Sequence, residues 1–409
     1  MSGHGALEPE WVDGLRFCPH CGSRGKAAEC TYDGHVTVPA VKFDPNVVIR
    51  PGDVLAGRYR LTSQIAKGGY GAIYAGEHAV TGQEVAIKVL KTDFGGPDDA
   101  TIRRFFREAR VTASLKHPNT IRVFDVGQAP GGAFFLAMEM LKGPTLEHIL
   151  TQRLAVGRSL SEVETIDVAI PVLRSLGEAH ALGLVHRDMK PSNIILADFG
   201  DGEPVVKLVD FGIAWMHGSS LTTTGMALGT PAYMSPEQCE ATELDGRSDL
   251  YAFGILLYRC LAGDVPFRQS SAVAIMQSHL RAPVPDVRKA TLSPVSDAFN
   301  AVLQRALAKR PADRFARAAD MRKALEAVRD LYWPDEPEAT TGLVESVTPL
   351  TLTPRQVNIS GLAALLQPPT SLAITASQPR SSPAIPVAVV AETKASSGAP
   401  SAAGSEKTK

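Results

Sequence analysis

The chain has 409 residues, 44% of them hydrophobic, which is enough for one large domain of about 250–300 residues together with smaller segments. Its 42 basic and 43 acidic residues give a formal net charge of −1, so no general electrostatic attraction draws it to nucleic acid or anionic lipid. The N-terminus lacks the basic and apolar pattern of a secretory signal, and no run of about 18 apolar residues predicts a membrane span. We therefore expect a cytoplasmic protein that binds neither nucleic acid nor membrane.

Three of the five cysteines lie within the first 30 residues, in a pattern typical of a metal site rather than of a disulfide framework. Residues 18–22, CPHCG, have the spacing of a zinc knuckle, a tight turn that points two thiolates at one metal. Residues 30–34, CTYDG, form a second such turn with an aspartate in the fourth cysteine's position. The predicted zinc ligands are Cys18, Cys21, Cys30 and Asp33, with His20 and His35 as alternatives for the fourth place. A relic that binds no metal is the competing interpretation.

The N-terminal 35 residues carry three basic and five acidic side chains, which disfavours a nucleic-acid role and favours a structural or protein-docking role. An extended stretch then leads to residues with strand-like alternation, interrupted by one helical segment. The predicted strands are Tyr59–Ile65, Ala72–Glu77, Glu84–Leu90, Thr120–Val126 and Ala133–Met138. The predicted helix, Thr101–Leu115, ends before Pro118.

After Gly143 the apolar residues take on helical spacing. The predicted helices are Thr145–Arg153, Ser161–Leu182, Asp249–Ala262, Ala272–His279, Ser296–Ala308 and Ala316–Leu331. Beyond Trp333-Pro334 the chain is rich in Ala, Ser, Thr and Pro, a composition that predicts disorder. The resulting prediction is an α+β protein with a Cys-rich module (1–38), a linker (39–57), a two-lobed domain (58–332) and a tail (333–409). The two lobes are a β-rich one (58–138) and a helical one (144–332), joined by residues 139–143.

A glycine-rich turn separates the first two predicted strands. It consists of Ala66, Lys67, Gly68, Gly69, Tyr70 and Gly71, and its glycines would let the backbone approach a polyphosphate. Taken alone, it also fits an ordinary hairpin. A dinucleotide-binding turn fits less well, because Ala72 and Ile73 continue as strand instead of opening a helix. Further on, VAIK places Lys88 on an apolar strand, and Glu108 on the following helix is its candidate partner.

Two clusters of polar residues follow in the helical half. Residues 186–193, HRDMKPSN, lie between two apolar runs, where such a concentration of charge is costly unless it serves a site. Asp210-Phe211-Gly212 comes directly after another apolar strand. Two carboxylates and an amide suit Mg²⁺, a hard cation that prefers oxygen ligands.

The ordered motifs AKGGYG, VAIK, HRDMKPSN, DFG and SPE resemble the eukaryotic-like protein kinase superfamily over roughly Tyr59–Leu331. The segments HPNTIRVFDVG, GTPAYMSPEQ and SDLYAFG are similar to those of bacterial serine/threonine kinases. This resemblance implies a two-lobed kinase fold that transfers the γ-phosphate of Mg·ATP, or of the Mn²⁺ complex, to serine or threonine hydroxyls of protein substrates.

The resemblance also implies roles for the matched residues. Asp188 would accept or orient the substrate hydroxyl, and Lys190 would neutralise charge on the transferred phosphoryl group. Asn193 and Asp210 would hold Mg²⁺, while Lys88, positioned by Glu108, would contact the α- and β-phosphates. The implied nucleotide site comprises residues 65–73, from Ile65 to Ile73, together with Ala86, Lys88, Met138, Glu139, Leu141 and Ile195.

Arg187 directly precedes Asp188, and in this family that arginine commonly binds a phosphate on the activation segment. Thr222 and Thr224 lie in that segment, so we expect autophosphorylation there, through a transient homodimer. A merely polar loop is the alternative. Ala66 replaces the family's first glycine, which predicts an altered loop rather than an inactive one if its φ stays negative.

Two architectural features and two competing functions complete the prediction. Glu237 and Arg314 are expected to form a buried ion pair, and Asp249 to brace the catalytic loop. A pseudokinase scaffold would require loss of Lys88, Asp188 or Asp210, and all three are present. An adaptor would instead use the Cys-rich module or the tail, with Thr348-Pro349 and Thr353-Pro354, to dock a partner.

Overall fold

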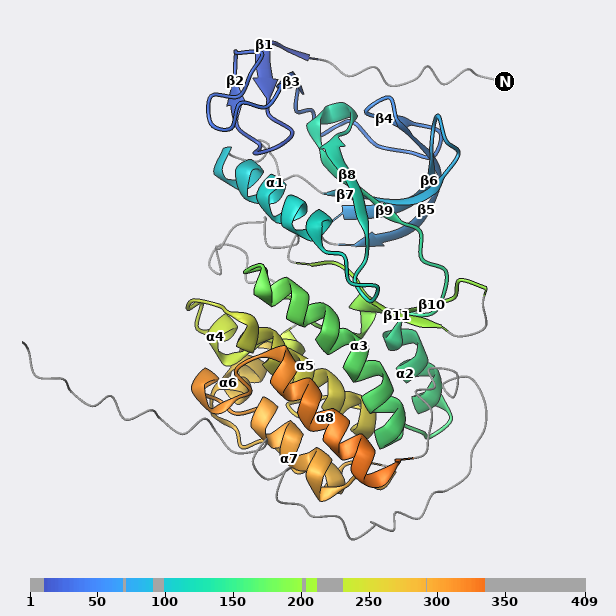
Figure 1. Cartoon of the computed structure of the whole chain (residues 1–409), viewed down its shortest axis with the longest axis vertical. Helices are drawn as coiled ribbons and strands as arrows, with labels where there is room; N and C mark the ends of the chain where they lie inside the picture. Colours follow the sequence, from blue (N-terminus) through green and yellow to red (C-terminus); the bar gives the residue numbers. More distant parts are fainter. Residues whose placement is uncertain are drawn as a thin grey trace, which may run out of the picture. The chain divides into compact units, whose positions relative to one another are not determined.

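The structure is a computed structural model of the chain, and it describes residues 11–68, 71–90, 99–200, 204–211, 231–291 and 293–334. The predicted disordered tail after its first two residues, 333 and 334, lies outside the described residues, as do the two activation-segment threonines, Gly69, Tyr70 and Gly212; Trp333 is buried in the core of the helical lobe. The described part divides into a β-rich lobe and a helical lobe (Figure 1), which confirms the predicted α+β architecture.

A six-stranded antiparallel sheet forms the first lobe, in the order β4-β5-β6-β7-β9-β8. Its central strands β7 and β9 are buried along almost their whole length, whereas β5 alternates buried and exposed side chains only over its first residues. Helix α1 (Asp99–Ser114) packs beside this sheet through Phe105 and Phe106, which contact Phe134 on β9. The strands are β4 (Val54–Leu55), β5 (Tyr59–Gly68), β6 (Gly71–His78), β7 (Glu84–Leu90), β8 (Val123–Gln128) and β9 (Phe134–Glu139).

The Cys-rich segment forms a small sheet of its own, ordered β2-β1-β3. Its strands are β1 (Trp11–Phe17), β2 (Arg24–Gly25) and β3 (Val38–Val41). Strand β3 therefore carries the module past residue 38, into the stretch that the sequence presents as linker. Figure 1 shows this module next to the N-terminal half of α1.

The second lobe is built on α3 and α5, whose apolar residues form one continuous core with α7 and α8. Ser161 begins α3 with a capping box: its side chain accepts from the Glu164 backbone N–H, and Glu164 accepts from the Ser161 N–H. The helices are α2 (Leu146–Ala155), α3 (Glu162–Ala181), α4 (Pro236–Cys239), α5 (Gly246–Ala262), α6 (Ala272–Arg281), α7 (Asp297–Ala306) and α8 (Ala318–Tyr332). An antiparallel hairpin of β10 (Ile194–Ala197) and β11 (Val205–Leu208) lies on the side facing the first lobe.

The predicted helices and strands agree with the observed ones to within a few residues, with one informative exception. The strand expected from Thr120 begins at Val123. Thr120 instead forms a parallel bridge with Leu208 of β11, and the Ile121 N–H donates to the Leu208 carbonyl at 3.0 Å. The backbone groups of Asn119 and Ile121 thus bond to Leu208 and link the lobes rather than extend the sheet.

The predicted ion pair between Glu237 and Arg314 is present and buried, with distances of 2.7 and 2.9 Å between the guanidinium and carboxylate. Arg314 also donates to the carbonyls of Arg247, Ala308 and Lys309. Burial acts to raise the pKa of Glu237, but the hydrogen bond and charge of Arg314 outweigh it and lower that pKa. The pair is therefore fully hydrogen-bonded, as a buried charge requires.

Removing one partner of this pair should be costly. Arg314→Ala would leave the Glu237 carboxylate buried without its cation, and we expect a loss of about 3–5 kcal/mol in the free energy of unfolding. Urea denaturation measures this quantity. Arg268→Ala is the matched control, because its pair with Asp264 is largely exposed and should be worth at most about 1 kcal/mol. Equal losses in the two variants would contradict the prediction.

Candidate active site

Lys88 and Asp210 form an ion pair between the two lobes. Lys88 lies in the middle of β7, opposite Ile73 of β6 and Leu136 of β9, so neighbouring strands fix its position on both sides. Its Nζ is 2.8 Å from Oδ1 of Asp210, which follows β11 with a left-handed φ of 62°. Burial acts to raise the pKa of Asp210, but the charge of Lys88 outweighs it, so the net shift is downward. Asp210 is therefore held as a carboxylate.

Glu108 pairs with Arg187 in this structure, and not with Lys88 as the sequence analysis expected. Glu108 lies on α1, and its Oε1 is 3.3 Å from Nη1 of Arg187. The physical reason is the presence of two cations and two carboxylates in one partly buried region, where Lys88 is already neutralised by Asp210. Each of these four charges thus has an opposite charge beside it. Exchanging those partners would restore the expected Lys88–Glu108 pair.

Asp188, Lys190 and Asn193 are joined by short contacts in the loop between α3 and β10. Lys190 Nζ is 2.7 Å from Asp188 Oδ2. The Asn193 amide donates both to the Asp188 carbonyl at 2.7 Å and to its Oδ2 at 3.2 Å. These contacts fix the rotamer of the Asp188 carboxylate and place a cation beside it. A carboxylate held in this way can accept a proton from a hydroxyl.

Asp249 on α5 fixes the position of this loop through hydrogen bonds. Its carboxylate accepts the backbone N–H of His186 and that of Arg187, both at 2.8 Å, and lies 2.7 Å from His180 Nε2. Burial acts to raise the pKa of Asp249, but the hydrogen bond from His180 and the nearby positive charge lower it overall. These hydrogen bonds let Asp249 brace the loop, as the sequence predicts. Arg187 itself has a φ of 66°, a strained value for a residue other than glycine.

A cluster of apolar side chains lines the region between the sheet and β10. It contains five of the predicted nucleotide residues, namely Ile73, Ala86, Met138, Leu141 and Ile195. It also contains residues that the sequence analysis missed, namely Ile121, Val123, Met140 and Val209. Val209 could have been found from its place directly before Asp210. The others carry no signal beyond being apolar.

The glycine-rich turn continues the β5–β6 hairpin as far as it is described. Ala66 pairs with Ile73, Lys67 with Ala72, and Gly68 with Gly71. Ala66 does not adopt a positive φ, so alanine is tolerated there. Gly71 has a φ of 139°, and a Cβ there would lie 2.0 Å from the Val89 carbonyl oxygen, which admits only glycine.

Two predicted nucleotide residues are not members of the apolar cluster. Ile65 on β5 is 53% exposed. Ala72 packs into the cluster on the other side of the sheet, with Tyr74 and Val89, because neighbouring residues of a strand face opposite ways.

The side chain of Glu139 accepts a hydrogen bond from Lys207 Nζ at 2.8 Å. This contact anchors the segment that connects the lobes to β11.

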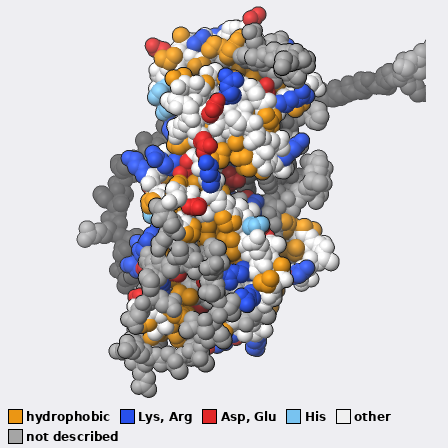
Figure 2. All heavy atoms as spheres, turned by 90° about the vertical axis from the view of Figure 1, so that its right-hand side faces the viewer, with side chains coloured by type: hydrophobic (Ala, Val, Ile, Leu, Met, Phe, Trp, Pro, Cys, Tyr) orange, Lys and Arg blue, Asp and Glu red, His pale blue; other side chains and the backbone are white. Residues whose placement is uncertain are grey.

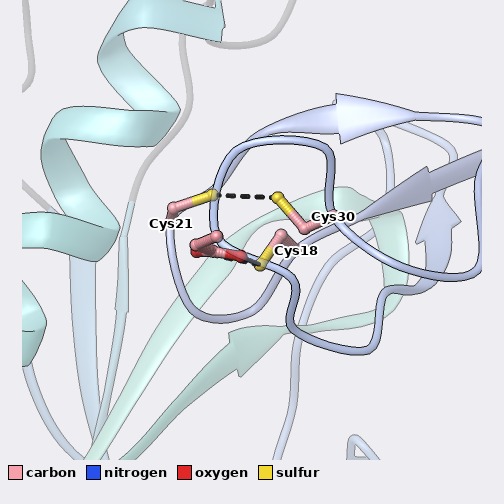
Figure 3. Close-up of side chains that lie close together, drawn as sticks. Cys18, Cys21 and Cys30 are labelled. Atoms are coloured by element: carbon pink, nitrogen blue, oxygen red, sulfur yellow. Dashed lines mark hydrogen bonds between the residues drawn. The ribbon is translucent and has the colours of Figure 1, made fainter.

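The Cys-rich module brings the four predicted metal ligands together. The ligand atoms of Cys18, Cys21, Cys30 and Asp33 all lie within 4.8 Å of one another. Figure 3 shows the Cys21 and Cys30 sulfurs facing each other, 3.5 Å apart. The two turns are alike: each glycine N–H donates to the carbonyl of its first cysteine, from Gly22 at 2.8 Å and from Gly34 at 2.9 Å.

Both alternative histidine ligands lie beside Asp33, and the ligand atoms of the three residues are also within 4.8 Å of one another. His20 Nδ1 is 2.8 Å from Asp33 Oδ2, His35 Nδ1 is 3.4 Å from Oδ1, and the two rings stack at 3.6 Å. The hydrogen bond from His20 lowers the pKa of Asp33, while burial raises that of Cys18 to about 12. Carboxylates that ligate a metal are themselves commonly hydrogen-bonded by outer residues, which orient the ligand.

Basic and acidic side chains occur together on the face of the molecule that Figure 2 shows, in keeping with the net charge of −1. Among the helices that the structure describes, none is long and apolar enough to span a membrane.

The fold, the charged loop and the Lys88–Asp210 pair together define a protein kinase. The family model described as "Protein kinase domain" matches residues 59–328, and the chain belongs to that family.

Bacterial serine/threonine-protein kinases are among its relatives. Serine/threonine-protein kinase pkn3 of Myxococcus xanthus is 39% identical over 283 residues, which cover 68% of this chain and 51% of that protein. PknL of Mycobacterium tuberculosis is 39% identical, covering 68% of this chain and 67% of the relative. The chain thus spans about half the length of the Myxococcus protein. A crystal structure of the M. tuberculosis PknI kinase domain matches with a TM-score of 0.54 and 28% identity, covering 69% of this chain and 99% of that one.

Replacing Asp249 should destabilise the fold in a pH-dependent way. Asp249→Asn removes a charged acceptor from three donors, and we expect a loss of about 1.5–3 kcal/mol in the free energy of unfolding near neutral pH. Because the folded pKa is depressed, this stabilisation is present above the unfolded pKa of about 3.9 and is lost as the pH falls through the folded pKa.

The difference between wild type and Asp249→Asn should therefore be full at about pH 7 and shrink below about pH 4, as measured by urea unfolding at each pH. Asp198→Asn, at an exposed position, is the control and should change stability by no more than about 0.5 kcal/mol. A difference between wild type and Asp249→Asn that stays constant over this pH range would show that the carboxylate charge is not what stabilises the loop.

Proposed function

We propose that this chain is a serine/threonine protein kinase that transfers the γ-phosphate of Mg·ATP to hydroxyl groups of protein substrates. The observation that carries the proposal is the joined set of Asp188, Lys190 and Asn193, opposite the Lys88–Asp210 pair. No catalytic residue required by the family is missing from the sequence. The names of the bacterial relatives support the choice of serine and threonine.

The described residues suit each part of that reaction. Adenine fits the apolar cluster around Ala86 and Met138, beside the backbone groups of Glu139 and Leu141. Lys88 provides a cation for the α- and β-phosphates. Asn193 and Asp210 offer an amide and a carboxylate, the oxygen donors that Mg²⁺ or Mn²⁺ prefers, and the ion would neutralise phosphate charge.

The chemical step is an in-line displacement at phosphorus. The substrate hydroxyl oxygen forms a bond to the γ-phosphorus while the bond from that phosphorus to the ADP oxygen breaks. The hydroxyl proton passes to the Asp188 carboxylate, which the Asn193 amide and Lys190 hold in place. Lys190 also offsets charge on the phosphoryl oxygens. Positioning and charge compensation provide most of the rate enhancement in such a step.

Autophosphorylation of the activation segment would change the charge pairing around α1. A phosphate on Thr222 or Thr224 would attract Arg187, which now pairs with Glu108. Glu108 would then be available to Lys88, and Asp210 would be released for the metal ion. The two threonines lie outside the described residues, so the support comes from Arg187 and Glu108.

We also propose that Cys18, Cys21, Cys30 and Asp33 hold a structural Zn²⁺. A tetrahedron with Zn–S bonds of about 2.3 Å has sulfur–sulfur edges of about 3.8 Å. The observed separation of 3.5 Å between Cys21 and Cys30 is close to that edge.

We further propose that the kinase is cytoplasmic. The Cys-rich module and the tail are proposed docking sites for a partner protein. Exposed Trp11 and Tyr32 on the module favour such docking.

Loss of the proposed proton acceptor should abolish phosphate transfer. Asp188→Asn keeps the side-chain shape but removes the base, and we expect kcat to fall by about 10²–10⁴-fold with little change in ATP binding. Radiolabelled ATP and a generic basic protein substrate measure the transfer. Asp198→Asn, an exposed carboxylate outside the site, should leave it unchanged. A wild type that binds ATP but transfers no phosphate would establish the pseudokinase instead, and partner binding unaffected by Asp188→Asn in such a protein would identify an adaptor.

Autophosphorylation should appear on Thr222 or Thr224. Mass spectrometry after incubation with Mg·ATP should find phosphate there in the wild type and none in Asp188→Asn alone, because the modification needs the catalytic base. Mixing the wild type with tagged Asp188→Asn should label the inactive chain if the reaction proceeds through a transient homodimer. An active enzyme with both threonines unmodified would contradict the prediction.

A further inference from the structure

The first knuckle of the Cys-rich module is pressed against the backbone of α1. Gly22, which follows the proposed ligand Cys21, is so close to the helix that a Cβ would lie 2.9 Å from the Ile102 carbonyl oxygen and 2.9 Å from Phe106 Cδ2. It would also lie 3.1 Å from the Arg103 Cα. Because two of these neighbours are backbone atoms, a side chain here could be accommodated only by moving the knuckle away from α1.

The module also shares a hydrophobic core with α1 and β7. Phe17 and Ala40, from β1 and β3, are buried in one cluster with Phe106 of α1 and Leu90 of β7. The rings of Phe17 and Phe106 lie 5.6 Å apart. This cluster therefore connects the module to the helix that carries Glu108 and to the strand that carries Lys88.

The module has little core with which to fold unaided. Within residues 11–41 the buried apolar side chains are Phe17, Cys18, Cys30, Ala40 and Val41, and two of these are proposed metal ligands. Segments of this size usually need a metal or disulfides to be stable. Zinc bound at the knuckles would thus provide the folding free energy that keeps Gly22 and Phe17 in place.

We propose that the zinc-bound module holds α1 in place against the sheet. Kinase activity therefore depends on metal occupancy of the Cys-rich site. The proposal rests on the zinc site and kinase activity proposed above. Without metal, Phe17 would leave the cluster and Gly22 would leave its contact with α1, so α1 would lose packing that holds Glu108 beside Arg187. Loss of zinc should therefore lower activity rather than raise it.

Alanine substitutions at two glycines of the module separate the effect of a clash with α1 from the effect of backbone strain. Gly22→Ala and Gly14→Ala both place alanine at a positive φ, 73° and 64°, in the same module. A Cβ at Gly14 meets nothing within 4 Å, whereas one at Gly22 collides with α1. We expect Gly22→Ala, still carrying one zinc per chain, to exchange amide hydrogens faster across residues 102–109 and to lose about 5-fold or more in kcat/KM. Gly14→Ala should match the wild type in both.

Metal removal tests the same coupling without a clash. Stripping zinc from the full chain with a chelator, or removing a ligand with Cys21→Ser, should accelerate exchange in α1 and reduce activity to a similar extent. Adding back Zn²⁺ to the stripped wild type should restore both, whereas Mg²⁺ should not, because thiolates prefer the softer ion.

Zinc content and hydrogen exchange are also measured in the Asp188→Asn background. The effect of zinc binding on α1 is therefore tested even if the chain transfers no phosphate. A purified chain without zinc that cannot be loaded with it would overturn the proposal. So would Gly22→Ala and stripped wild type whose α1 exchange equals that of Gly14→Ala.

Discussion

The Asp249 carboxylate is the constraint on which the candidate active site depends. It holds the backbone of His186 and Arg187 while Arg187 occupies a left-handed conformation, which costs on the order of 1–3 kcal/mol. His186 in turn lies 2.9 Å, through Nε2, from the carbonyl of Val209, the residue before Asp210. One buried charge on α5 thereby fixes both the loop that carries Asp188 and the start of the segment that carries Asp210.

Helix α1 is the second organising element, because it belongs to two networks at once. Glu108 on one face pairs with Arg187, and the proposed exchange of partners would bring it to Lys88. Phe106 on another face packs against the Cys-rich module and β9. A small displacement of this helix would change which carboxylate neutralises which cation.

Most of the fold could be predicted from sequence, because hydrophobic periodicity is a local signal, and motif order predicts the candidate catalytic residues, whose roles are proposed above. The partner of Lys88 could not, since it depends on a balance among charges from four segments. Ala72 was assigned to the nucleotide site although the pleat turns it to the other face of the sheet. Gly22 shows the same limit: a knuckle requires glycine there in any case, so its contact with α1 leaves no trace in the sequence.

The position of the module is fixed at its far end as well as at Gly22. After β3 the chain runs along the turn between β8 and β9, where the Asp44 N–H donates to the Gly131 carbonyl at 3.1 Å. On β3 itself, the Val41 N–H donates to the Gln128 side chain of β8. The stretch that reads as a linker is thus attached to the sheet at the edge nearest the module. Because both ends are anchored to the same lobe, a change at the cysteines cannot be absorbed by a flexible connection, and must be borne by α1.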